Sequence, residues 1–225
     1  MKNLIFLVTM SVMALLCGEA LAQSTWNPSD KTSGVTLSNG NLSASVTNVA
    51  TRDGVRGTLS HASGKYYFEV TYTLQIPVST AFIGIDNSLT NLSLLIFGSG
   101  DSNGASYNSA NGHLRANANI VNIAGSPYTT GDVVSFAVDV SNHLIYWAKN
   151  GTWQNSANPG LGTGGVDYIT TLPVFPAVQF NAGSTATVTL NTGATTFAYS
   201  IPSGFSAWSG AVASSPFIFT PTVIP

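Results

Sequence analysis

One stretch decides the fold of this chain: Gly131-Asp132-Val133-Val134-Ser135-Phe136-Ala137-Val138-Asp139-Val140-Ser141-Asn142-His143-Leu144-Ile145-Tyr146-Trp147-Ala148-Lys149-Asn150-Gly151. Apolar residues fall at every second position from Val134 to Val140. Side chains of a β-strand point alternately to opposite faces, so this spacing predicts a strand with one buried face. Ser141-Asn142 predicts a tight turn into a second strand over 143–149. Asn150-Gly151 predicts another hairpin, because both residues tolerate positive φ.

The same period of two recurs on both sides of this stretch. In residues 65–73 one face is apolar or aromatic, and we expect the opposite face to meet water. The residues of the apolar face are Tyr66, Phe68, Val70 and Tyr72. No long helical period is visible, and about a dozen strands separated by Gly- and Asn-rich loops are expected. This organisation predicts an all-β sandwich or barrel.

Residues 1–22 have the features of a secretory signal peptide. Lys2 supplies a positive charge, Leu4–Cys17 is mostly apolar but too short to span a bilayer, and Ala20-Leu21-Ala22 fits a small-x-small cleavage site. These features predict a secreted, periplasmic or cell-surface protein that does not insert in a membrane after signal removal. The alternatives are a buried N-terminal helix and a lipoprotein centred on Cys17.

Composition limits the function classes. Charged residues make up 7% of the chain, hydrophobic residues 44%, and the net charge is −2. Typical globular domains carry roughly 25% charged residues, so uncharged polar residues and glycine must cover much of this surface. No basic cluster is present, which argues against a nucleic-acid partner. The only cysteine, Cys17, lies in the predicted signal, so the mature chain depends on a core rather than on disulfides.

The last residues differ in character from the rest. Phe217-Ile218-Phe219 lies between Pro216 and Pro221, and the chain ends in Val223-Ile224-Pro225. An exposed apolar patch is unfavourable unless it meets a partner. We therefore expect residues 210–225 either to pack on the domain formed by residues 23–209 or to dock to a partner.

Several short phrases occur in a fixed order between Trp26 and Trp208. They are Trp26-Asn27-Pro28-Ser29-Asp30-Lys31, Gly54-Val55-Arg56, Ser63-Gly64-Lys65-Tyr66-Tyr67-Phe68-Glu69-Val70, Gly84-Ile85, the stretch quoted above, and Pro173-Val174-Phe175-Pro176-Ala177-Val178. In this order they resemble a SPRY domain, and the opening phrase resembles bacterial and phage members in particular. The resemblance implies a concanavalin-like jelly roll, a two-sheet antiparallel β-sandwich used mainly for binding, with the binding surface in loops at one edge.

The resemblance also implies which residues would bind a ligand. The peptide-binding loops of the family correspond here to 51–53, 86–91 and 181–184. The candidate residues in these loops are Thr51, Arg52, Asp53, Asn87, Asn91, Asn181 and Ser184. Some peptide-binding members have a tryptophan in the third loop, where this chain has Ala182. The scaffold is therefore better supported than any known peptide specificity.

Glu69 is the only glutamate after the predicted signal. It could serve as a catalytic carboxylate or as a structural partner for Arg56 or Lys65. Acid–base chemistry on glycosides usually needs two facing carboxylates. We therefore expect the structural role.

Other residues suited to catalysis or metal binding are few. No Glu-x-Asp-x-x-Glu cluster and no Gly-x-Ser-x-Gly elbow occurs, and loss of Cys17 removes a thiol nucleophile. His61, His113 and His143 are expected in exposed turns and lack metal-binding spacing. Asp101-Ser102-Asn103-Gly104 offers one carboxylate, which predicts a turn rather than a calcium loop. We expect no enzyme activity, no metal and no cofactor.

Two aromatic residues complete the set of candidates. Trp153 follows the Asn-Gly turn, and Tyr107 lies beside loop residues 101–111. Either ring could stack on a sugar or peptide if exposed, and core packing is the alternative.

These observations favour an exported, non-enzymatic binding module that recognises a protein or a surface glycan through loops at one edge of the sandwich. A second hypothesis is a structural component of a virion, fibre or cell surface, which the low charge and the apolar C-terminus favour. A concanavalin-like glycoside hydrolase is the third, and the missing second carboxylate argues against it.

Overall fold

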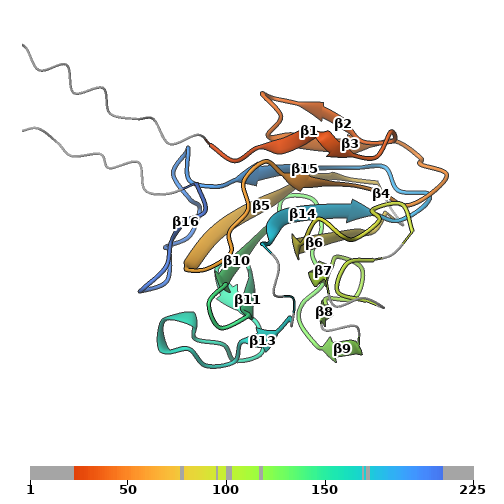
Figure 1. The fold of residues 1–225 in the computed structure, drawn as a ribbon. Helices are drawn as coiled ribbons and strands as arrows, with labels where there is room; N and C mark the ends of the chain where they lie inside the picture. Colours follow the sequence, from red (N-terminus) through yellow and green to blue (C-terminus); the bar gives the residue numbers. More distant parts are fainter. Residues whose placement is uncertain are drawn as a thin grey trace, which may run out of the picture.

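The computed structural model describes residues 23–76, 79–94, 96–99, 103–116, 119–168, 170 and 173–209. These residues form two packed β-sheets and one short 3-10 helix, η1 (Pro159–Leu161) (Figure 1). The predicted signal peptide and the C-terminal tail lie outside the described residues. Within them, no helix is long and apolar enough to cross a membrane.

The first sheet has seven strands in the described residues. In spatial order they are β1 (Trp26–Lys31), β4 (Asp53–Gly57), β14 (Phe175–Phe180), β6 (Ala81–Asp86), β7 (Gly104–Asn108), β8 (Leu114–Ala116) and β9 (Asn119–Ile123). All neighbouring pairs are antiparallel.

The second sheet has nine strands in the same part of the chain. Its main order is β12 (Thr152–Trp153), β11 (Leu144–Lys149), β10 (Val133–Asp139), β5 (Lys65–Gln75), β15 (Ala186–Asn191), β3 (Ser43–Val46) and β2 (Thr36–Ser38). Two short strands, β13 (Val166–Asp167) and β16 (Ser206–Ala207), pair with β11 and β5. Only the β16 pairing is parallel among those described, so the predicted two-sheet antiparallel sandwich is confirmed. Five of the sixteen strands have two or three residues, which explains why about a dozen were expected.

The hydrophobic core lies between the sheets and follows the predicted alternation. Phe68, Val70 and Tyr72 of β5 are fully buried there, and Tyr66 packs at its margin. The deciding stretch forms β10 and β11, joined by a turn over 140–143, and Val134, Phe136, Val138 and Val140 all enter the core. Asn150 and Gly151 have φ values of 47° and 75° and connect β11 to β12, which confirms the second hairpin.

We predicted that the outer face of the second sheet meets water, but this face is covered. Tyr67 of β5, with Ala137 and Tyr146, forms a second buried cluster there. Residues 193–207, here called the C-terminal strap, cross this face and contribute Phe197, Ile201 and Phe205 to the cluster. The period of two identified the two faces correctly, but it cannot show that a segment about 130 residues later in the chain covers one of them.

Glu69 fixes the C-terminal strap to the sheet. Its side chain is 3% exposed and accepts hydrogen bonds from the Tyr67 hydroxyl at 2.7 Å and from the backbone N–H groups of Ala198 and Tyr199 at 2.8 and 2.9 Å. The expected structural role therefore matches these contacts. The expected partners were wrong, because Arg56 pairs with Asp30 and Asp86, and Lys65 pairs with Asp139.

The histidines are half-buried rather than exposed as predicted. His61 stacks on Tyr66 with ring centroids 3.5 Å apart, and its Nε2 lies 2.8 Å from the carbonyl oxygen of Trp208. Neutral His61 with the proton on Nε2 donates this bond. Burial lowers the pKa of His61, and the hydrogen bond to Trp208 offsets only part of that effect.

We predict that His61 makes stability fall in mild acid. Its folded-state pKa is lower than in the unfolded chain, so the unfolded chain takes up the proton first. The contribution of His61 is complete above its unfolded pKa of about 6.5 and is lost as pH falls toward the folded-state pKa. Denaturant unfolding of wild type and His61→Phe from about pH 7.5 to 5 should give a steeper decline for wild type. Parallel curves would contradict the prediction.

Candidate functional site

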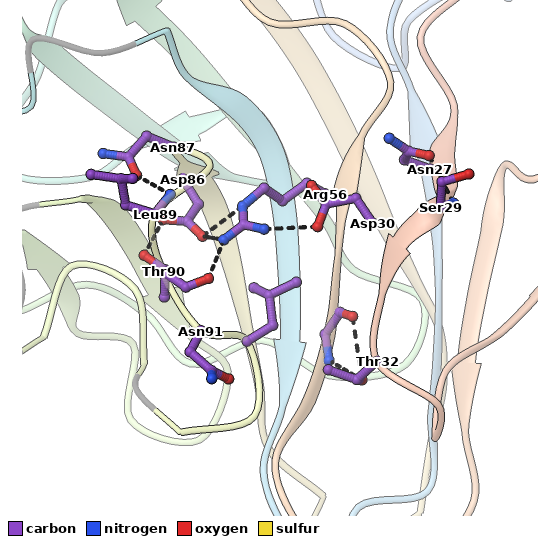
Figure 2. Close-up of polar contacts among 12 residues, drawn as sticks. Asn27, Ser29, Asp30, Thr32, Arg56, Asp86, Asn87, Leu89, Thr90 and Asn91 are labelled. Carbon is purple, nitrogen blue, oxygen red and sulfur yellow. Dashed lines mark hydrogen bonds and ion pairs between the residues drawn. The ribbon is translucent and has the colours of Figure 1, made fainter.

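A buried arginine lies on the outer face of the first sheet, on the strand next to the edge strand β1. Arg56 of β4 is 3% exposed and extends across the outer face between two carboxylates (Figure 2). Its Nε donates to Asp86 Oδ2 at 3.0 Å, and its Nη1 donates to Asp30 Oδ1 at 2.9 Å. Asp86 is fully buried, whereas Asp30 is 36% exposed. Because a buried charge is stable only when paired, Arg56 and Asp86 constrain each other's position.

The same network holds the residues that follow β6. Thr90 donates its hydroxyl to Asp86 Oδ1 at 2.7 Å, and its carbonyl oxygen accepts from Arg56 Nη2 (Figure 2). Asn87 is fully buried, accepts from the Leu89 N–H at 2.8 Å, and donates to the Thr170 hydroxyl at 2.8 Å. These hydrogen bonds therefore fix the position of the first residues of 87–94, which we call the front segment.

Three backbone carbonyls hold the front segment against the sheet. The carbonyl of Thr90 accepts from Arg56, that of Leu92 from the Gln179 side-chain amide, and that of Leu94 from Arg52 Nη1 at 2.7 Å. The donors come from β4, β14 and the residue before β4. The front segment thus lies along the outer face across two strands.

Arg52 joins two of the three predicted loops and the end of the front segment. Besides the bond to Leu94, its Nη2 lies 3.4 Å from Asn181 Oδ1, in the loop after β14. The sequence-predicted loops at 51–53 and 181–184 therefore meet at one end of the first sheet, where Asp53 pairs with Phe180. The loop at 86–91 starts at the opposite end, and the front segment runs back along the outer face until Leu94 reaches Arg52. Six exposed or half-buried residues of these loops and of the front segment form what we call the front surface. It consists of Thr51, Arg52, Leu89, Asn91, Leu94 and Asn181.

Two leucines make the front surface unusual. Leu89 and Leu94 are each 67% exposed although the residues between them are anchored. A single leucine exposed to water is common in proteins and needs no explanation. Two exposed leucines on one fixed segment indicate a surface that contacts a partner.

Four of the predicted site residues are buried instead. Asp53 accepts from the Gly34 N–H at 3.0 Å, Asn87 anchors the front segment, and Ser184 accepts from the Thr80 N–H at 3.0 Å. Tyr107, considered as an exposed aromatic, is fully buried because its position on β7 faces the core, where it packs on Tyr128. These four belong to the framework of the domain, whereas Thr51, Arg52, Asn91 and Asn181 stay predicted contact residues.

Sequence reasoning missed Leu89, Leu94 and Arg115. Leu94 lies in the apolar run from Leu92 to Phe97, and such a run inside a loop was a usable signal. Phe97 is buried against Phe82 and Ala177 on the same outer face, which accounts for part of the run. Arg115 lies between the core residues Leu114 and Ala116, so the period of two places it on the outer face.

We predict that Asp86→Asn lowers the free energy of unfolding by about 3 kcal/mol, because it leaves Arg56 buried with only half-exposed Asp30 as counter-charge. Urea unfolding measures the loss. Lys149→Gln is the matched control, since it breaks a more exposed ion pair to Asp132 at 3.1 Å. Its loss should be much smaller. Equal losses for the two variants would contradict the assigned role of Asp86.

No family model matches the chain. One relative and two solved structures are similar to it, and they agree with this architecture. Ran-binding protein 10 of Danio rerio is 29% identical over 132 residues, which cover 56% of this chain and 22% of that protein. The chain therefore spans about a fifth of the length of this relative.

Two solved structures share the fold at low sequence identity. The SPRY domain of human HERC1 has a TM-score of 0.61 at 16% identity, covering 73% of this chain and 96% of that domain. The PSpry domain of TRIM65 has a TM-score of 0.55 at 12% identity, covering 76% and 92%. Together with the two-sheet topology, these similarities show that the chain has the SPRY domain fold.

Proposed function

We propose that this protein is a non-enzymatic interaction module that binds a partner protein through the front surface. The observation that carries the proposal is the pair of exposed leucines, Leu89 and Leu94, on a segment fixed from beneath by Arg56, Gln179 and Arg52. Apolar side chains held in place before binding lose little conformational entropy on contact, so they are effective anchors.

The use of the acidic residues supports a binding role rather than catalysis. Glu69 has both carboxylate oxygens engaged in hydrogen bonds that hold the C-terminal strap. Asp86 and Asp139 pair with Arg56 and Lys65. In the described residues, no group of three or more histidines, cysteines and acids is arranged to hold a metal ion. These carboxylates serve the framework.

A protein partner is favoured over a glycan. Tyr107 is buried in the core, and Trp153 is half-buried against the cluster beneath the C-terminal strap. Sugar recognition by aromatic stacking needs an open ring face, which neither residue provides at the front surface. The exposed aliphatic pair fits a polypeptide better.

We also propose that the protein is exported. The support is the sequence of residues 1–22, with Lys2, the apolar run Leu4–Cys17 and the Ala20-Leu21-Ala22 site. The similarity to bacterial and phage members rests likewise on the opening phrase from Trp26 to Lys31. An assembly role for residues 210–225 stays a prediction.

The test is a selection of short random peptides on the immobilised full chain, followed by affinity measurements with variants. We expect Leu89→Ser with Leu94→Ser to weaken binding of the selected peptides by about tenfold or more, because both apolar anchors are lost. Leu161→Ser is the matched control, since Leu161 is 77% exposed but lies on η1. Unchanged binding by the double variant would overturn the front surface as the binding site.

A further inference from the structure

Two arginines on the outer face of the first sheet have no carboxylate partner within the described residues. The ion pairs of the described residues engage Arg56, Lys65 and Lys149, and none engages Arg52 or Arg115. The Nε atoms of both are buried without a hydrogen-bond partner. An arginine has five N–H donors in a rigid fork, so these two side chains retain unused donors.

The two arginines lie over the same part of the first sheet. Arg115 lies over Phe82, which pairs with Gln179, and Arg52 lies beside Asn181, two residues further along the chain from Gln179. Burial lowers the pKa of Arg52, and the positive charge of Arg115 lowers it further. Burial alone lowers the pKa of Arg115. Both remain charged, because an arginine pKa starts far above neutral pH. Two like charges held together in partial burial are unfavourable, and a bound anion would relieve that cost.

The surroundings of the pair restrict the kind of anion. The Arg115 guanidinium lies over the Phe82 ring, 5.3 Å from its centroid, which is a cation–π contact with a side chain of β6. Arg52 contacts the carbonyl of Leu94, whose side chain is 67% exposed, so an apolar anchor adjoins the charge. The chain has only seven Lys and Arg residues and a net charge of −2, which does not favour a polyanion such as nucleic acid.

We propose that Arg52 and Arg115 form a recognition site for the carboxylate side chains of an acidic segment in a partner protein, with Leu94 receiving an adjacent apolar residue. The planar guanidinium matches a carboxylate through two parallel hydrogen bonds, which an ammonium group cannot reproduce. This inference rests on the proposed function and assigns the chemistry of its partner.

The experiment uses the peptides selected on the full chain. We expect enrichment of Asp and Glu next to an apolar residue. Replacing the acids of a selected peptide by Asn and Gln should weaken its binding by about tenfold or more, and so should Arg115→Gln in the protein. The Arg115 side chain makes no hydrogen bond within the described residues, so this variant keeps the front segment in place. Arg52→Lys should lose affinity although it keeps the charge.

Lys65→Gln is the charge control, since it removes one positive charge from the other sheet, and it should bind as wild type does. The selected peptides could show no acidic enrichment and still lose binding to the Leu89→Ser, Leu94→Ser double variant. That result would overturn the carboxylate site but not the proposed function. Peptides that bind this double variant unchanged, or the recovery of none, would overturn the proposed function and the inference with it. Enrichment confined to phosphorylated peptides, tested in a parallel array, would also overturn the carboxylate assignment.

Discussion

The buried ion pair between Arg56 and Asp86 is the interaction on which the front of this molecule depends. Asp86 ends β6 and Arg56 lies two strands away in the same sheet, across β14. Because neither charge can stay buried alone, the pair fixes where the chain leaves β6. Thr90 bonds to both partners, through its hydroxyl to Asp86 and through its carbonyl oxygen to Arg56, so the loop after β6 is tied to the sheet. Loops are usually mobile, but these hydrogen bonds hold the front segment in place before a partner binds.

On the outer face of each sheet, a buried charged side chain holds a segment of the chain in place. On the first, Arg56 holds the front segment, and on the second, Glu69 holds the C-terminal strap through the N–H groups of Ala198 and Tyr199. In each case one buried charge satisfies backbone groups of residues that lie outside the strands. With only 7% charged residues, the chain places several of them in such roles. Against this distribution, Arg52 and Arg115 stand out because neither forms an ion pair with any of the described residues.

Local patterns predicted the framework, and long-range contacts decided the rest. The alternation from Val134 to Val140 and the Asn150-Gly151 turn depend on neighbours in sequence, so both could be predicted. Tyr67, one partner of Glu69, lies two residues away on the same strand face. The other two, Ala198 and Tyr199, lie about 130 residues away, and no local rule identifies them. The resemblance pointed to the three predicted loops, and their role in binding stays a prediction. Burial of Asn87 and Tyr107 depends on contacts with residues distant in sequence. The apolar run that contains Leu94 is visible in the sequence, but the position of Leu94 depends on which carbonyls Arg52 and Gln179 engage.

Amide hydrogen exchange of the front segment tests the central claim most directly. The N–H groups of Leu89 and Leu94 bond to Asn87 Oδ1 and to the Asn91 carbonyl, while that of Val138 lies in the core ladder of β10. In Asp86→Asn, exchange at Leu89 and Leu94 should rise by about tenfold or more relative to Val138, because the segment opens locally without unfolding the sandwich. If exchange at the two leucines stays as in wild type, or changes only in step with Val138, the ion pair does not hold the front surface.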